Sequence, residues 1–153
     1  MPRLLLVAMI AALGATSAAA RPLPEGGATA AEVAQVLRDM GYRAEVTVDS
    51  VGDPLVRSAL DGSSFGVYFY GCEQSRCTSL QFATGFDGDP LSYATINRWN
   101  AEHRFGRAYL DGDMDPVMEM DVDVERGAST ELIEEAVATW AILVPEFKDF
   151  IGF

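Results

Sequence analysis

Cys72 and Cys77 are the only cysteines of the chain and could form a disulfide, a redox pair or part of a metal site. Four residues separate them, and apolar runs flank them on both sides, so we expect a hairpin with the cysteines facing across its turn. Facing residues of antiparallel strands have Cα atoms about 4.5–5.5 Å apart, which suits a disulfide. Redox pairs usually have two intervening residues at a helix start, and zinc needs more ligands than these cysteines and the single histidine, His103. We therefore predict a structural disulfide.

The same pairing sorts the neighbouring side chains onto two faces of a sheet. One face is apolar and is predicted to be the core side, with Phe65, Val67, Phe69, Leu80, Phe82 and Phe86. The other face carries Tyr68 and Tyr70 beside Ser79, Gln81 and the cysteines. Two interpretations stay open for these tyrosines: they lie under a helix, or they form a half-exposed aromatic contact surface.

A third group of side chains lies in the run NRWNAEHRFGRA, residues 97–108. On a helix, Asn97, Asn100 and Arg104 would share one side and could recognise an anionic or polar partner. In the alternative interpretation Trp99 fills the core and the asparagines bond to a nearby loop. The candidate binding surface comprises Tyr68, Tyr70, Asn97, Trp99, Asn100 and Arg104.

Aspartates and glutamates dominate residues 111–125. The run DGDMD resembles the start of a calcium loop, but Pro116 stands where that loop needs glycine and Val122 where it needs glutamate. We therefore predict a solvated turn there. In the run MEMDVDVE, acids alternate with apolar residues, which predicts a strand with a solvated outer face that resists aggregation; a basic partner docking on that face is the alternative.

Motifs for catalysis and cofactor binding are missing from the sequence. It contains neither G-x-S-x-G nor a glycine-rich phosphate loop. We predict no catalytic residue, no cofactor and no metal site. Carboxylate pairs stay open, because the sequence does not show which acids meet in space.

Residues 1–20 have the order of a secretory signal peptide. Arg3 precedes an apolar run over residues 4–13, and three alanines end at Ala20, where we expect cleavage. The apolar run is shorter than the roughly 20 residues that span a bilayer, which argues against the alternative of an uncleaved anchor. We predict a periplasmic or secreted protein, and such a compartment permits the disulfide.

The chain is acidic, with 11 basic and 23 acidic residues and a formal net charge of −12. Removal of residues 1–20 takes away one arginine, so the mature side chains would sum to −13. Such a surface repels nucleic-acid phosphates and anionic lipid. We expect neither nucleic-acid binding nor membrane insertion after cleavage, although solubility alone would also explain the charge.

The remaining sequence predicts a flexible Pro- and Gly-rich leader at residues 21–28 and one domain at residues 29–153. Thr29 and Glu32 have the spacing of a capping box, and Pro145 should kink or end the last helix. We expect an α+β domain of order α-β-β-β-β-α-β-β-α, whose antiparallel sheet has helices packed on one face. The expected helices cover 29–41, 90–103 and 130 onward, and the expected strands cover 44–49, 55–60, 64–71, 77–86, 104–110 and 117–125.

Several runs together, GYRAEVTVD, FGVYFYGC, SLQF, INRWNAEHRFGRAYLD and MEMDVDV, resemble the YbjN family of bacterial sensory transduction regulators. The resemblance extends over roughly residues 29–153 and is most specific at N-x-W-N-x-x-x-R-F. It implies a fold similar to type III secretion chaperones, which are α+β domains that often dimerise and bind protein, and it implies no catalytic residues. Family members described as regulators of motility or stress responses are cytoplasmic, so the predicted signal peptide and disulfide depart from that pattern.

Two functional hypotheses follow. The first is a non-enzymatic exported binding module that engages a protein partner or itself, through the sheet or the 90–103 helix. The second is a small-ligand binder or envelope hydrolase with a pocket lined by Tyr68, Tyr70 and Trp99. A deep closed pocket holding two facing carboxylates would favour the second, and a flat or filled surface would favour the first.

Overall fold

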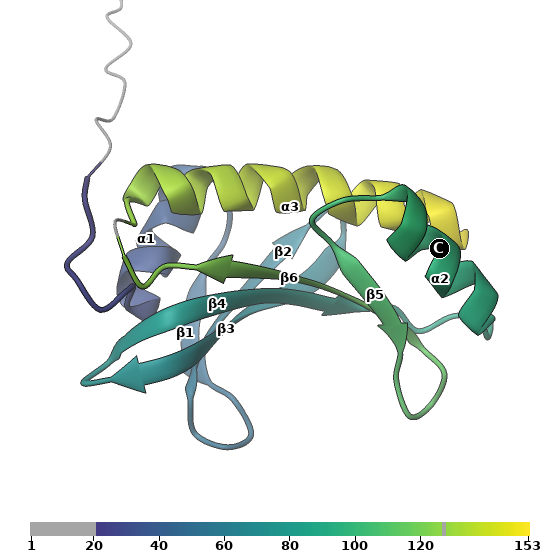
Figure 1. Ribbon diagram of the computed structural model, residues 1–153, viewed down its shortest axis with the longest axis horizontal. Coiled ribbons are helices and arrows are strands. Elements are labelled where there is room, and N and C mark those ends of the chain that lie inside the picture. Colours follow the sequence, from purple (N-terminus) through teal and green to yellow (C-terminus); the bar gives the residue numbers. More distant parts are fainter. Residues whose placement is uncertain (1–20, 127) are drawn as a thin grey trace, which may run out of the picture.

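The protein is an antiparallel sheet with helices packed against it (Figure 1). The computed structural model describes residues 21–126 and 128–153, so the predicted signal peptide lies outside the described residues. The predicted α+β class and element order are confirmed. The elements are α1 (Ala30–Asp39), β1 (Glu45–Val48), β2 (Pro54–Leu60), β3 (Ser63–Glu73), β4 (Arg76–Gly85), α2 (Tyr93–Glu102), β5 (Arg107–Leu110), β6 (Pro116–Asp123) and α3 (Thr130–Ile151).

The six strands of the described chain follow the order β1-β2-β3-β4-β6-β5. The first four are sequential hairpin neighbours, whereas β6 inserts between β4 and β5. The register of the β3–β4 hairpin is the predicted one, with Tyr70 opposite Ser79 and Cys72 opposite Cys77. The two cysteines form a disulfide, and their Cα atoms are 3.9 Å apart, closer than the spacing expected for facing residues.

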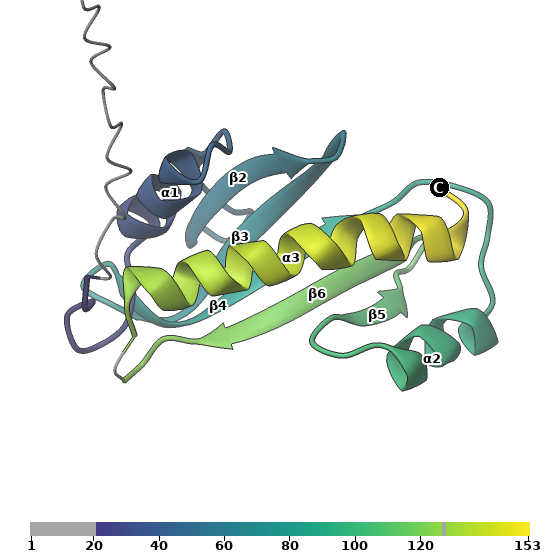
Figure 2. The same ribbon diagram turned by 90° about the horizontal axis from the view of Figure 1, so that it is seen from above.

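Two helices cover one face of the sheet (Figures 1 and 2). α3 runs along this face, α1 lies beside it, and α2 lies next to β5 near the C-terminal end of α3. Trp140 of α3 packs on Phe65 and Phe82, with ring centroids 6.1 and 5.8 Å away. Apolar strand residues and the apolar stripe of α3 therefore form a single core, as their alternation and helical spacing predict.

Helix ends follow from local hydrogen bonds. The capping box is present: the Thr29 backbone N–H donates to Glu32 Oε2 at 2.8 Å, and the Glu32 N–H donates to Thr29 Oγ1 at 3.2 Å. Pro145 does not end α3, which continues to Ile151, because buried Val144 and Phe147 hold the helix to the core on both sides of the proline.

None of the described helices is long and apolar enough to cross a bilayer.

Residues 21–28, predicted to be a flexible leader, make backbone hydrogen bonds to the rest of the domain. The Arg21 carbonyl accepts from the Thr130 N–H at 2.9 Å, and the Leu23 N–H donates to the Ala128 carbonyl at 2.9 Å. Further along, Ala28 and Cys77 exchange two backbone hydrogen bonds of 3.0 and 2.9 Å. The segment thus ties the disulfide hairpin to the start of α3.

Candidate functional site

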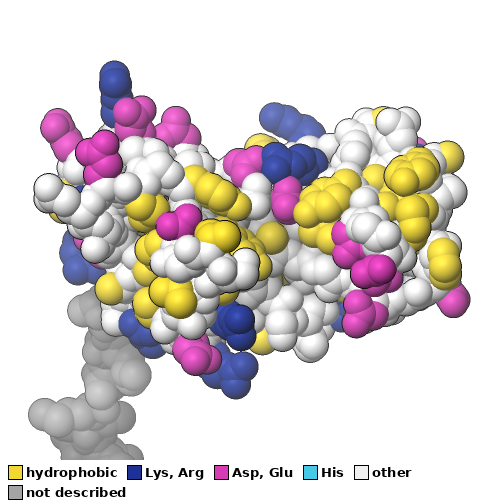
Figure 3. All heavy atoms as spheres, turned by 90° about the horizontal axis from the view of Figure 1, so that it is seen from below, with side chains coloured by type: hydrophobic (Ala, Val, Ile, Leu, Met, Phe, Trp, Pro, Cys, Tyr) yellow, Lys and Arg dark blue, Asp and Glu magenta, His cyan; other side chains and the backbone are white. Residues whose placement is uncertain are grey.

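The open face is the sheet face opposite α1 and α3, and no described helix covers it (Figure 1). In each strand, every second side chain points to this face. Seen from this side, patches of hydrophobic or tyrosine side chains alternate with acidic and basic ones (Figure 3). The face includes Tyr68, Tyr70, Gln81, Ala83, Arg107, Tyr109, Glu119 and Asp121.

The exposure of the tyrosines decides between the two interpretations of this face. Tyr70 is 48% exposed and Tyr68 is half-buried, so they form a partly exposed aromatic surface, not one buried under a helix. The ring of Tyr68 lies over Gly66, where an added Cβ would approach Tyr68 Cε2 to 2.8 Å. Gly66 faces Ala83 across the strands, so two small residues leave a depression in the middle of the face.

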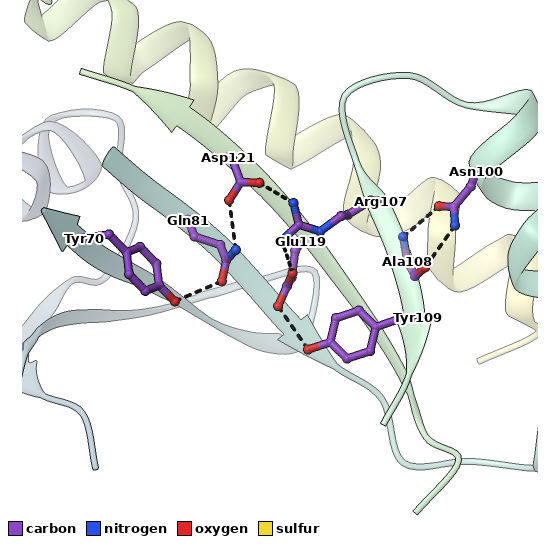
Figure 4. Close-up of polar contacts among 8 residues, drawn as sticks. All are labelled: Tyr70, Gln81, Asn100, Arg107, Ala108, Tyr109, Glu119 and Asp121. Carbon is purple, nitrogen blue, oxygen red and sulfur yellow. Dashed lines mark hydrogen bonds and ion pairs between the residues drawn. The ribbon is translucent and has the colours of Figure 1, made fainter. Parts of the chain in front are cut away.

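A chain of polar contacts crosses four strands of the open face, β3, β4, β6 and β5 (Figure 4). The Tyr70 hydroxyl donates to Gln81 Oε1 at 3.2 Å, and Gln81 Nε2 donates to Asp121 Oδ1 at 2.8 Å. Arg107 of β5 continues the chain by donating to Glu119 and Asp121 of β6. We call the whole set the open-face network, and its members are Tyr70, Gln81, Asp121, Arg107, Glu119 and Tyr109.

The insertion of β6 between β4 and β5 makes the network, because it places Arg107 directly opposite Glu119. Arg107 Nη2 donates to Glu119 Oε2 at 2.7 Å, and Nη1 donates to Asp121 Oδ2. The Tyr109 hydroxyl donates to the other oxygen of Glu119 at 3.0 Å. The Glu119 side chain is 13% exposed and that of Arg107 is 55% exposed, so the acid lies inside the network and the guanidinium at its rim.

Protonation follows from this arrangement. Burial, followed by the hydrogen bond to Glu119, raises the pKa of Tyr109 above its ordinary value. Burial, followed by the negative charge of Glu119, raises the pKa of Tyr70. Burial lowers the pKa of Arg107, but its hydrogen bonds to Asp121 and Glu119 outweigh that effect and raise it. Both phenols therefore stay neutral and the guanidinium stays charged near neutral pH.

Two shallow hollows lie side by side on the open face. The first, about 310 Å³, is lined by Tyr68, Tyr70, Tyr109 and Glu119 above a floor that includes Ala83. We call it the tyrosine hollow. The second, about 470 Å³, shares Tyr68 and Ala83 with the first and extends to Arg43 and Arg57. Together they form a continuous depression across the sheet, with Glu119 at one end and Arg43, Glu45 and Arg57 at the other.

Trp99 does not join the tyrosines, so the predicted pocket of Tyr68, Tyr70 and Trp99 does not form. The Trp99 side chain is fully buried and stacks on His103, with ring centroids 3.7 Å apart. Phe147 of α3 approaches the indole edge-on at 4.8 Å. The alternative interpretation, in which Trp99 fills the core, is the one that the structure supports.

Asn100 has an internal partner. Its Nδ2 donates to the Ala108 carbonyl at 3.0 Å, and its Oδ1 accepts from the Ala108 N–H at 2.8 Å (Figure 4). The side-chain amide thus pairs with the outer edge of β5 as a neighbouring strand would. An internal contact with a loop was one of the two interpretations of the sequence; the contact of Asn100 is internal, but its partner is the strand β5.

Asn97 and Arg104 are exposed, but they do not share a helix side. α2 ends at Glu102, one residue short of the predicted 90–103 helix, so Arg104 lies beyond it. The Arg104 guanidinium instead lies 4.9 Å from the ring centroid of Phe105. The six residues of the candidate binding surface therefore fall into separate places, with only Tyr68 and Tyr70 on the open face.

Sequence reasoning missed the parts of the site that depend on strand order. The alternation of β6 already placed Glu119 and Asp121 on one face, and Gln81 was assigned beside the tyrosines. The contacts of Arg107 and Tyr109 could not be predicted from local sequence, because they depend on β6 pairing with both β4 and β5. The sequence gives only a weak indication of them: a basic residue begins the short strand that precedes the acidic strand.

The acidic turn after β5 is ordered by its own backbone. The Asp111 carboxylate accepts from the N–H groups of Asp113 at 2.9 Å and Asp115 at 3.0 Å. Among the described residues, no group of three or more His, Cys, Asp or Glu side chains could hold a metal ion. Asp111 therefore shapes the β5–β6 turn.

Comparison with known sequences shows the family of the chain. No curated protein matches the chain. A family model, YbjN, described as "Putative bacterial sensory transduction regulator", matches residues 29–153, which covers α1 to the C-terminus. The family that the sequence motifs resemble is thus the family that matches over the whole folded domain, and the chain belongs to the YbjN family.

Proposed function

We propose that this chain is an exported, non-enzymatic regulatory module that binds a protein partner through its open face. The observation that carries the proposal is a broad sheet face without a covering helix, on which the open-face network holds partly exposed tyrosines in place. Tyrosines with an apolar ring and a satisfied hydroxyl are enriched at protein interfaces. The family description supports the regulatory part of the proposal.

The form of the face favours a macromolecule over a small ligand. Small-molecule sites usually bury about 70–90% of the ligand's surface, whereas the two hollows here are shallow and join across the sheet. Trp99 is in the core, so no third aromatic wall closes over Tyr68 and Tyr70. Glu119 and Asp121 both bind Arg107 and do not face each other as an acid–base pair.

A different protein is a better partner than a second copy of this chain. The open-face network contains two acids and one arginine, and the whole chain carries a net charge of −12. Two copies that paired through their open-face networks would bring like charges together, which opposes association. Export rests on the predicted signal peptide, and the disulfide between Cys72 and Cys77 agrees with an oxidising compartment.

Site-specific photo-crosslinking in the producing cell tests the proposal. A photoreactive amino acid at Ser79, on the open face opposite Tyr70, should give a discrete adduct with one other protein in the periplasmic fraction. The matched control is the same amino acid at Ala138, on the exposed side of α3, which should give none. Equal capture at both positions, an adduct of twice the chain's mass, or a protein that stays in the cytoplasm would contradict the proposal.

A further inference from the structure

We propose that the tyrosine hollow receives the positively charged side chain of an arginine or lysine from the partner protein. This inference rests on the proposed function and names the chemistry by which the partner is recognised. The hollow brings together three tyrosines and one carboxylate: Tyr68 and Tyr70 of β3, Tyr109 of β5, and Glu119 of β6.

Aromatic rings attract organic cations through their negative faces, and several rings around one site act together. Two of the three rings here are fixed by their own hydroxyls. Tyr70 is held by Gln81, and Tyr109 is held by Glu119. Rings that are already in place lose little conformational freedom when a ligand binds, so the hollow is preorganised.

The charges of the hollow complement a cation. Glu119 is the charged side chain that lines the hollow; with the neighbouring Asp121 it contributes two negative charges, and Arg107, which binds both acids, compensates one of them. The pKa of Tyr70 is raised first by burial and then by the negative charge of Glu119. Each Glu119 oxygen accepts one hydrogen bond within the network, which leaves a further acceptor position on each for an incoming N–H.

A side chain of a protein fits this hollow better than a free amine. The tyrosine hollow is open to solvent on the sheet face and continues over Ala83 into the second hollow. A small cation would make few contacts there, whereas a polypeptide could place one basic residue in the tyrosine hollow and its neighbours along the depression. Arg43 and Arg57 outnumber Glu45 at the other end and would favour an acidic residue further along the same segment.

Peptide binding followed by NMR tests the inference. The ¹⁵N-labelled protein is titrated with a blocked heptapeptide in which three arginines alternate with serines, and in parallel with the same peptide carrying citrulline for arginine. Citrulline keeps the shape of arginine and removes its charge. The arginine peptide should bind about tenfold more tightly and should shift the signals of Gln81, Tyr109 and Glu119. Equal affinities, or shifts confined to other faces, would overturn the inference.

Matched charge variants separate the site from the general acidity of the protein. E119Q should weaken binding of the arginine peptide about tenfold, whereas E135Q, which removes the same charge from the exposed side of α3, should change it less than about twofold. Equal losses in the two variants would show attraction by net charge alone. Circular dichroism establishes that each variant is folded.

A ring variant leaves the open-face network in place. Replacement of Tyr68 by leucine keeps an apolar side chain and removes an aromatic face of the hollow, so binding should weaken about threefold. If E119Q does not fold, this variant decides: unchanged affinity for the arginine peptide would contradict the inference.

Two further measurements distinguish a free cation from a protein side chain, and a failure of this inference from a failure of the proposed function. If methylguanidinium shifts the same signals with an affinity equal to that of the peptide, a free small cation is the ligand and the inference is wrong. If the partner captured at Ser79 is captured equally by the E119Q protein, the proposed function stands and the inference fails. Absence of any capture at Ser79 defeats the proposed function itself.

Discussion

On the covered face of the sheet Phe82 of β4 packs against Trp140, whereas on the open face its neighbour Gln81 bonds to Tyr70 and Asp121. The two residues are adjacent in one strand, and strand alternation points their side chains to opposite faces of the sheet. Apolar contact holds α3 to the covered face, and a hydrogen-bonded network orders the open face. The comparison suggests that the covered face supplies the stability of the fold and that the open face is available for recognition.

The largest expected effect lies on the covered face. Trp140→Ala removes a fully buried indole between Phe65 and Phe82 and should lower the free energy of unfolding by about 3–5 kcal/mol, measured by urea denaturation. Tyr70→Ala on the open face is the control and should cost less than about 1 kcal/mol. Similar losses for the two variants would remove the contrast between the faces.

The disulfide should have the next largest effect. Replacing both Cys72 and Cys77 by alanine removes the disulfide, which links residues five positions apart. The free energy of unfolding should fall by about 2 kcal/mol, because the unfolded chain regains conformational freedom. Comparing the reduced unaltered protein with the double variant separates the effect of losing the covalent bond from the effect of changing the side chains. Stability that is unaffected by both treatments would mean that the backbone bonds between Ala28 and Cys77 already hold the hairpin.

Substitutions of Asn100 and Asn97 on α2 test whether the Asn100 side chain stabilises the β5 edge of the sheet. Asn100→Ala leaves the Ala108 N–H and carbonyl without their side-chain partner and should cost about 1–2 kcal/mol in thermal or urea unfolding. Asn97→Ala, on the exposed side of the same helix, should stay within about 0.5 kcal/mol. Faster amide exchange at Ala108 in the first variant alone would locate the effect.

The smallest expected effect is the change in stability when the phenols of Tyr70 and Tyr109 ionise at high pH. The pKa values of Tyr70 and Tyr109 are raised in the folded protein, so folding favours their neutral forms. The resulting stabilisation is complete below the ordinary tyrosine pKa of about 10 and is lost as the pH rises through the raised values. Ultraviolet titration of the phenols should show late ionisation that Tyr70→Phe and Tyr109→Phe each reduce; unchanged curves would contradict the network.

Local patterns were sufficient to predict much of the fold. The β3–β4 register followed from two cysteines and from alternating aromatic residues, and the capping box followed from Thr29 and Glu32. Those features depend on residues that are close in sequence. The firm attachment of residues 21–28 depends on contacts with Cys77 and Thr130, far along the chain, and composition alone could not indicate it.

The candidate site was predicted only in part. Tyr68 and Tyr70 were placed on the correct side of their strand, but whether a helix covers that side depends on how three helices distribute over the sheet. Trp99 and Asn100 carry the most specific motif of the chain, yet both have structural roles in the core and at the β5 edge. The network itself required the pairing of β6 with β4, a non-local event.

The attachment of Arg21 has a consequence for the timing of maturation. If residues 1–20 are removed after Ala20, as the sequence predicts, the new amino terminus begins at the residue whose carbonyl and N–H bond to Thr130. A peptidase needs extended, accessible backbone on both sides of its cut. If this cleavage occurs, we expect it to precede the docking of the segment, because docking holds Arg21 against Thr130 at the start of α3.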